Sequence, residues 1–314
     1  MSLGIRDGDV RDLPATGSLA LRRLVPRWAM AWPALLWWAF FFVIPIGWIA
    51  VYSLGMKPAT PGAGPVTLEV LSLDNYMAAT SGVFLVVFWI TMRTAVLGTI
   101  ACALVGFPVA YALANCVSPK WRSVLLFLLV LPYWTSFLLR TFAWRIVLAP
   151  EGVLSGALQS LGIIDRPLGL LDSNAAVQLG IVYNYLPLMI LPMYVALERI
   201  DPAMIRASMD LGAGPVRTFL AVTVPLAAPG IVGGVLLTFI LAAGDYVVPA
   251  ILGGAKGLMV GNLVATQILS AQNLPLGAGM AILLIGMLAA VVGAAAIMLI
   301  GARSLLRHLR GPAI

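Results

Sequence analysis

Asp245 and a set of aromatic residues are the side chains of this sequence that are best suited to bind a cation. Asp245 is the only acidic residue inside an apolar stretch long enough to cross a bilayer. Ionisable groups at membrane depth are costly and face a cavity or a partner, so Asp245 is a functional candidate. An aromatic ring face can stabilise an alkylammonium group by roughly 0.5 to 2 kcal/mol. The aromatic residues at comparable positions are Tyr133, Trp134, Tyr183, Tyr185 and Tyr246.

A structural role for the same residues remains open at this point. Arg140 lies towards the outer end of another apolar stretch, and a buried ion pair between Arg140 and Asp245 would belong to the scaffold. The aromatic side chains would then be ordinary packing of a helical bundle. The sequence leaves both readings of Asp245 possible, a contact with a ligand or a pair with Arg140.

Metal, nucleotide and nucleophile chemistry are not expected in this chain. Cys102 and Cys116 have no CxxC or Cys/His spacing, and His308 is the only histidine. The sequence contains no GxxxxGK[ST] loop to cradle a phosphate, and no pair of catalytic carboxylates or nucleophile elbow. We therefore expect no catalytic residue, no metal and no cofactor bound by this chain itself.

The elements that would position these side chains are transmembrane helices. Hydrophobic residues make up 61% of the 314 residues, charged residues 10%, and the mean hydropathy is +1.02. Soluble domains carry about 25% charged residues, so the composition excludes a soluble enzyme, a nucleic-acid-binding module and a disordered chain. We expect an all-α integral membrane protein in contact with the lipid bilayer. Its six spans are predicted at about 28–54, 92–115, 123–147, 175–197, 226–250 and 279–302.

The basic residues predict how these spans are oriented. Thirteen of the Lys and Arg residues outside the spans fall on one side and three on the other. Because basic residues concentrate in cytoplasmic loops, we expect both termini to be cytoplasmic. The chain then divides into a cytoplasmic tail over 1–27, a six-helix transmembrane domain over 28–302 and a second cytoplasmic tail over 303–314.

The cytoplasmic segment 198–225 predicts a structured elbow of two helices. Asp201 followed by Pro202 is typical of an N-cap and a first-turn proline, so a helix should begin there and run to about residue 211. Gly212 would end this helix in a left-handed conformation. Gly214-Pro215 would open a second helix that leads to Pro225 and the next span. Such an elbow is more typical of a docking surface than of a passive linker.

The same segment carries a motif of a known family. The pattern Ala207-x4-Gly212-x9-Val222-x-Val224-Pro225, preceded by Ile200-Asp201-Pro202, resembles the EAA loop of the permease subunits of ABC importers. The resemblance runs from the first span to the last and leaves out the N-terminal tail. Four other stretches resemble the putrescine/spermidine permeases more narrowly: LPYWTSFLLRTFAW at 131–144, LGIIDRPLGLL at 161–171, IVYNYLPLMILPMYVAL at 181–197 and GDYVVPAILGG at 244–254.

This resemblance implies a type I ABC importer permease fold in a bacterial inner (cytoplasmic) membrane. Such a chain pairs with a second permease, expected here to be a similar but different chain. It sits on two ATPase subunits that bind ATP and Mg²⁺, and it receives its solute from an extracytoplasmic solute-binding protein. The solute would be a small organic cation such as putrescine or spermidine. Another solute, such as an opine, an aminophosphonate or an anion, remains an alternative because of Arg93, Arg140 and Arg145. A secondary transporter is a less favoured alternative.

The resemblance also implies the roles of individual residues. In the family the elbow inserts into a cleft of the ATPase. This chain has Arg206 where the motif usually begins with Glu, and Ser208 replaces the second Ala, so the contacting residue of the ATPase should differ too. The residues implied in coupling are Asp201, Arg206, Ala207, Ser208, Asp210, Leu211, Gly212, Ala213 and Pro225. The residues expected in the substrate path, from their charge or aromatic rings at membrane depth, are Asp245, Tyr246, Trp134, Tyr133, Arg140, Tyr183 and Tyr185.

Overall fold

The computed structural model of the protein describes residues 31–58, 64–80, 82–254 and 257–309, with side chains up to residue 297. Nearly all of these residues are helical, and the single β-bridge among them joins Met56 to Thr67. The chain forms two units, residues 1–51 and 52–314. The predicted tail over 1–27 lies outside the described residues.

The described part of the first unit is one apolar helix. It consists of α2 (Trp32–Trp38), the π-helical turn η2 (Ala39–Val43) and α3 (Ile44–Tyr52). None of its side chains is buried. Its 21 residues span about 30 Å at 1.5 Å per residue, which matches the hydrocarbon core of a bilayer. The span predicted over 28–54 therefore ends two residues early, at Tyr52, and its first residues lie outside the described range.

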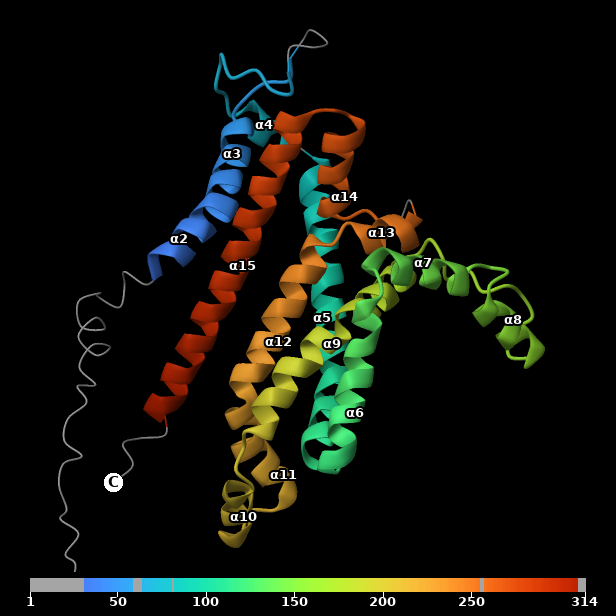
Figure 1. Ribbon diagram of the computed structural model, residues 1–314, viewed down its shortest axis with the longest axis vertical. Helices are drawn as coiled ribbons and strands as arrows, with labels where there is room; N and C mark the ends of the chain where they lie inside the picture. The colour runs from blue at the N-terminus through green and yellow to red at the C-terminus, as the bar shows by residue number, and fades with distance from the viewer. Residues whose placement is uncertain (1–30, 59–63, 81, 255–256, 310–314) are drawn as a thin grey trace, which may run out of the picture. The chain divides into compact units, whose positions relative to one another are not determined.

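The core of the second unit is a bundle of three helices (Figure 1). These are α5 (Val83–Asn115), α9 (Asn174–Glu198) and α12 (Val224–Gly244), and each packs against the other two. Glycine lets α12 approach α9 closely, because a Cβ atom at Gly230 would lie 2.4 Å from the carbonyl oxygen of Pro192. Small residues of this kind are how membrane helices achieve close packing without a hydrophobic driving force.

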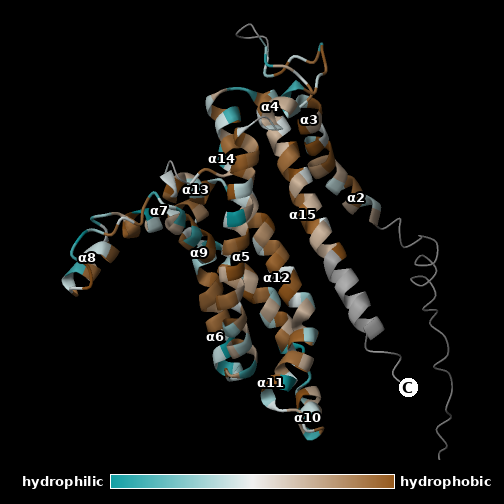
Figure 2. Cartoon of the chain, turned by 180° about the vertical axis from the view of Figure 1, so that it is seen from behind, coloured by the Kyte–Doolittle hydropathy of each residue, from teal (hydrophilic) through white to brown (hydrophobic). Residues whose placement is uncertain are grey.

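Further helices complete the second unit. Among them α13 (Val247–Leu252) packs on α7 (Phe137–Leu148) and α9, and α15 (Leu274–Leu309) packs on α4 (Asp74–Thr80) and α14 (Val260–Ala265). The long helices are apolar along most of their length, and hydrophilic residues gather at α8, at α10 and at the turn before α6 (Figure 2). The bounds are α4 Asp74–Thr80, α6 Pro119–Val130, η3 Leu131–Trp134, α7 Phe137–Leu148, α8 Val153–Ser160, α10 Pro202–Asp210, α11 Pro215–Thr218, η4 Phe219–Thr223, α13 Val247–Leu252, α14 Val260–Ala265, η6 Thr266–Ser270 and α15 Leu274–Leu309.

The span predicted over 123–147 is not a single helix. The segment Pro119–Trp134 meets the segment Phe137–Ser160 at a bend of 90°. Pro132 lies in the 3₁₀ turn η3, and Thr135 and Ser136 between the two segments are extended. Proline cannot donate a helical hydrogen bond, so the helix ends where the sequence shows only a continuous apolar run. Within the described residues, five helices are long and apolar enough to cross a membrane, and the number is six if the bent pair counts as one span.

Other predicted span limits also differ from the structure. The second span begins at Val83 instead of residue 92, and the fifth runs over Pro215–Gly244 instead of 226–250. The last helix starts at Leu274 and continues to Leu309, through most of the segment predicted as a tail over 303–314. Helices continue beyond the apolar stretch because only the hydrocarbon core demands apolar side chains. The cytoplasmic location of both termini remains a prediction.

Candidate functional site: the elbow and a buried polar cluster

The first helix of the elbow, α10, begins as its sequence predicts. The side chain of Asp201 accepts a hydrogen bond from the backbone N–H of Ala203 at 2.8 Å, and Pro202 is the first helical residue. An aspartate in this position satisfies a free N–H group of the first turn, and proline has no N–H to leave unsatisfied. The residues Asp201-Pro202 therefore fix where the helix starts.

The end of α10 is a left-handed glycine turn. Gly212 has a φ of +85°, and its N–H group donates to the carbonyl of Met209 at 2.9 Å. The N–H of Ala213 donates to the carbonyl of Ser208 at 3.2 Å, so the two bonds form a Schellman motif. A Cβ atom at Gly212 would meet nothing within 4 Å, so the backbone angle alone favours glycine here.

The second arm of the elbow is continuous with a membrane span. Helix α11 passes through the π turn η4 into α12, and the hydroxyls of Ser208 and Thr218 form a hydrogen bond of 3.0 Å that joins the two arms. Pro225, predicted as the end of the elbow, is the second residue of α12. Because Pro225 lacks an N–H group, the wider turn directly before it accommodates the missing bond.

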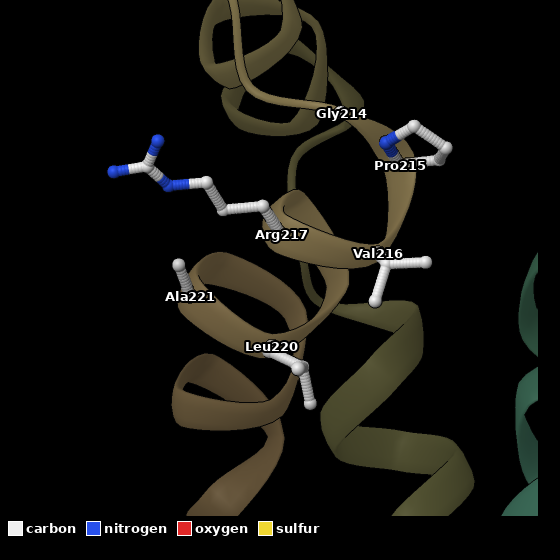
Figure 3. A pocket seen from close by; sticks show the side chains of 6 residues that line it. All are labelled: Gly214, Pro215, Val216, Arg217, Leu220 and Ala221. Carbon is white, nitrogen blue, oxygen red and sulfur yellow. The ribbon is translucent and has the colours of Figure 1, made fainter.

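The elbow exposes apolar side chains beside basic ones. Leu211 is 89% exposed and Val216 is 71% exposed. A cavity of about 740 Å³ lies along the second arm, where Arg217 extends to the side opposite Pro215 and Val216 (Figure 3). A second cavity, of about 510 Å³, is lined from both arms by residues that include Ala207, Ser208, Leu211, Ala213 and Arg217. Arg206 and Asp210 are exposed on α10. Exposed apolar groups with a polar rim are typical of a protein docking surface.

Asp245 lies in a break between two helices, deep in the second unit. It has an extended backbone after α12, and its side chain is at the N-terminus of α13. One carboxylate oxygen accepts the N–H groups of Val247 at 2.8 Å and Val248 at 3.2 Å. The other oxygen accepts the hydroxyl of Tyr185 on α9 at 3.0 Å. The residue is only 6% exposed, so these three donors replace the water that the carboxylate has lost.

Arg140 on α7 is buried without a carboxylate partner. It is 9% exposed, and its guanidinium carbon lies 4.5 Å from the centre of the Tyr133 ring and 5.9 Å from that of Phe137. Within the described residues the ion pairs are Arg122 with Glu198 and Arg145 with Asp172. The structural pair of Asp245 with Arg140, which the sequence left open, is therefore not formed.

Comparison with known proteins decides the family. The chain is 37% identical over 247 residues to the spermidine/putrescine transport system permease protein PotB of Haemophilus influenzae, a match covering 78% of this chain and 84% of that protein. The chain belongs to the PotB family of ABC transporter permeases. It is 35% identical to PotB of Escherichia coli, over 76% of this chain and 89% of the relative. It is 38% identical to the inner membrane ABC transporter permease protein YdcU of Escherichia coli, a match covering 60% of this chain and 63% of that protein. No protein-family model matches the chain.

Solved structures agree on the fold. A crystal structure of a bacterial ABC transporter involved in the import of the acidic polysaccharide alginate matches with a TM-score of 0.69 at 14% identity, covering 86% of this chain and 93% of that one. The bacterial alginate transporter in complex with an alginate-bound periplasmic protein matches with a TM-score of 0.68 at 14% identity, over 84% and 90%. This PotB-family chain is an integral protein of the bacterial inner membrane with the fold of an ABC importer permease.

Sequence reasoning missed two members of the buried cluster in this permease, Asn184 and Phe137. The hydroxyl of Tyr133 donates to the backbone carbonyl of Asn184, and the Phe137 ring lies 6.5 Å from that of Tyr185. Asn184 is fully buried, and its side-chain oxygen has no partner among the described residues. A lone amide in an otherwise apolar run was the signal that could have revealed it, because polar groups inside a span are costly.

Three of the predicted path residues lie at the margin of this cluster. The Tyr183 ring packs edge-on against Trp144 at 5.3 Å and shares a cavity with Arg140. Trp134 is 75% exposed and packs against Phe127. Tyr246 is also exposed, and its carbonyl accepts the side-chain amide of Asn262. Among the described residues, no hydrogen bond or ring contact joins Trp134 or Tyr246 to Asp245 or Arg140. The structure thus gathers Tyr133, Arg140, Tyr185 and Asp245, with Tyr183 beside them.

A further network that the sequence did not reveal lies just before the elbow. Arg122, next to the turn between α5 and α6, contacts Glu198 at the end of α9 at 3.0 Å. A second nitrogen of Arg122 donates to the carbonyl of Ala114 at 2.8 Å, and the hydroxyl of Tyr194 donates to Glu198 at 2.6 Å. These bonds tie the end of α5 to the residue where the elbow begins. Spacing could not reveal them, because Arg122 and Glu198 are far apart in the sequence.

Proposed function

We propose that this chain is the membrane-spanning subunit of an ATP-driven importer for putrescine and spermidine. The observation that carries the proposal is the 37% identity to a spermidine/putrescine permease across 84% of that protein's length. The two regions described above support it, because one is an exposed docking elbow and the other contains a buried carboxylate. A subunit with these features acts in transport and has no catalysis of its own.

The buried cluster has the chemistry that a polyamine requires. A polyamine brings two or more positive charges into a low-dielectric passage, where losing water is expensive. The Asp245 carboxylate can offset part of this cost, and the rings of Tyr133 and Tyr185 can add cation–π contacts of roughly 0.5 to 2 kcal/mol each. A weak site of this kind suits a permease, since tight binding would slow release of the solute.

The partners in this proposal follow from what the chain lacks and what it exposes. The sequence has no phosphate-binding loop, so ATP and Mg²⁺ would be bound by two separate ATPase subunits docked on the elbow. A second, similar permease chain would complete the membrane passage. An extracytoplasmic solute-binding protein would select the polyamine and deliver it. The periplasmic protein in complex with the alginate transporter supports this arrangement.

The test is uptake by the complete transporter reconstituted in proteoliposomes. We expect uptake of labelled spermidine and putrescine that requires both ATP and the solute-binding protein. An excess of an opine, an aminophosphonate or phosphate should leave this uptake unchanged. Uptake of one of those solutes in place of polyamines would contradict the proposed substrate. Polyamine uptake driven by an ion gradient without ATP would instead indicate a secondary transporter.

A further inference from the structure

The aromatic rings that could receive an ammonium group are already occupied by a cation of the protein itself. The guanidinium carbon of Arg140 lies 4.5 Å from the centre of the Tyr133 ring and 5.9 Å from that of Phe137. Both distances are within the range of about 6 Å at which a cation is attracted to a ring face. The hydroxyl of Tyr133 is held by the carbonyl of Asn184, so this ring has a fixed place.

Apart from these rings, little holds the Arg140 guanidinium where it is. Its Nε and Nη1 atoms are buried and have no hydrogen-bond partner among the described residues. No carboxylate of the described residues is paired with it either. Arginine presents five N–H donors and is normally placed by hydrogen bonds to carboxylates or carbonyls. The Nε and Nη1 atoms of Arg140 can therefore leave their place without breaking a hydrogen bond.

A cavity beside Arg140 offers the guanidinium an alternative place. It has a volume of about 210 Å³ and is lined by Arg140, Ala143, Trp144, Val147 and Tyr183. This is several times the share of about 30 Å³ that one water molecule takes in the liquid. The rings of Trp144 and Tyr183 are 5.3 Å apart and offer new aromatic faces to a cation. The side chain of Arg140 can therefore turn from one aromatic environment into another.

The occupied rings adjoin the buried carboxylate. The Phe137 ring lies 6.5 Å from the Tyr185 ring, and the hydroxyl of Tyr185 donates to Asp245 at 3.0 Å. A carboxylate and a pair of ring faces are thus joined through one tyrosine. Two neighbouring places that each favour a positive charge fit a ligand with two ammonium groups.

We propose that the rings of Tyr133 and Phe137 form a second ammonium subsite, which Arg140 fills until a polyamine displaces it. This inference rests on the proposed function and assigns part of its specificity to Arg140. A diamine or triamine places one ammonium at Asp245 and the next on the rings, and the guanidinium turns into the cavity beside Trp144. A monoamine has only one charge and cannot both bind Asp245 and replace Arg140.

The experiment is equilibrium binding of labelled spermidine to the purified transporter without its solute-binding protein. The Arg140→Met variant removes the competing charge and keeps an unbranched, flexible side chain in place of the arginine stem. We expect it to bind spermidine about 5-fold more tightly, the gain that corresponds to one cation–π contact of about 1 kcal/mol. Butylamine, a monoamine, should compete with spermidine in Arg140→Met at concentrations that leave the wild type unaffected. The Arg140→Lys variant keeps a competing cation and should stay close to the wild type.

The matched control is Arg145→Met, the same substitution on the same helix. Arg145 lies 3.9 Å from Asp172 and donates to the carbonyl of Ile251, so it is held outside the aromatic subsite. Its loss should leave spermidine affinity unchanged. Unchanged or weaker binding by Arg140→Met overturns the inference, and so does binding too weak to detect in both the wild type and Arg140→Met. Spermidine uptake by the wild-type transporter is measured in parallel. Normal uptake with unchanged binding by Arg140→Met contradicts only the second subsite, whereas absent uptake contradicts the proposed function as well.

A second measurement covers the case in which Arg140→Met does not accumulate. If spermidine drives the guanidinium towards Trp144, tryptophan fluorescence of the wild-type transporter should change on binding. This change should disappear in Trp144→Phe, while spermidine affinity stays within a factor of about 5 of the wild type, the equivalent of one aromatic contact of about 1 kcal/mol. An equal fluorescence change in wild type and Trp144→Phe overturns the inference.

Discussion

The elbow and the buried cluster are built in opposite ways. The elbow is one continuous segment whose shape is fixed by its own residues, with Asp201 at one end of α10 and Gly212 at the other. The cluster takes Tyr133, Arg140 and Tyr185 from three separate elements and adds Asp245 from a break between two helices. The elbow is exposed, and the cluster is buried. A docking surface can thus be encoded locally, whereas a polar site inside the bundle depends on the whole fold.

The largest effect should follow from Gly212→Val in the elbow. A valine at a φ of +85° costs about 1 to 2 kcal/mol, although its side chain would meet nothing within 4 Å. The turn should rearrange, and transport should fall by a factor of about 5 to 30, which is what this energy corresponds to. Uptake and ATP hydrolysis by the reconstituted transporter measure the loss of coupling. Gly214→Ala is the control, since Gly214 is equally open but has a φ of −65°, and it should behave as wild type. Normal transport by Gly212→Val would remove the elbow from the coupling path.

The corresponding change in the cluster is Asp245→Asn. Asparagine keeps an oxygen that can cap α13, so abundance should stay near that of the wild type. The charge is lost, and spermidine binding to the transporter should weaken about 10-fold, the equivalent of roughly 1.4 kcal/mol. ATPase retention after detergent extraction should not change. Because Arg140 does not pair with Asp245, adding Arg140→Gln should not restore transport. Restored transport in the double variant would show that Asp245 and Arg140 form a structural pair in the working protein.

A smaller effect is expected from Arg206→Glu on the exposed face of α10. If Arg206 contacts an acidic residue of the ATPase, reversal of its charge should weaken assembly by a factor of about 5, typical of an exposed ion pair worth up to about 1 kcal/mol. Co-purification of the ATPase measures the loss. A charge reversal on the contacting ATPase residue should recover part of it in a double-mutant cycle. Unaltered retention would place Arg206 on a solvated face.

The smallest effects should come from the network of Arg122, Tyr194 and Glu198 just before the elbow. Glu198→Gln keeps the acceptor for Tyr194 and removes only a partly exposed ion pair with Arg122, so unfolding in detergent should shift by less than about 1 kcal/mol. Arg122→Met also removes a bond to the carbonyl of Ala114 and should destabilise more than Glu198→Gln. Thermal unfolding of the two purified variants tests this order. Equal shifts would mean that the carbonyl contact contributes nothing.

The sequence could predict those features that depend on neighbouring residues. Asp201-Pro202 predicted where α10 begins and Gly212 predicted where it ends, because helix caps and left-handed turns need specific residue types. The apolar runs also indicated where long helices lie, since a bilayer imposes a minimum length, and five helices of the described residues are long and apolar enough to cross a membrane.

What the sequence could not predict depends on tertiary structure. The bend after Pro132 lies inside a uniformly apolar run, and the end of α12 at Gly244 is followed by more apolar residues. Hydropathy alone does not reveal either break. Likewise, the partner of Asp245 could have been Arg140 or Tyr185, and only the packing of α9 against α12 selects the tyrosine.

The central claim is that the elbow couples transport to the ATPase, whereas the buried cluster binds the solute. Its direct test is spermidine binding to three purified transporters, the wild type, Gly212→Val and Asp245→Asn. Gly212→Val should bind spermidine as the wild type does, while its uptake falls by a factor of about 5 to 30. Asp245→Asn should bind about 10-fold more weakly, the equivalent of roughly 1.4 kcal/mol. Wild-type affinity in Asp245→Asn, or an equal loss of affinity in Gly212→Val, would contradict this claim.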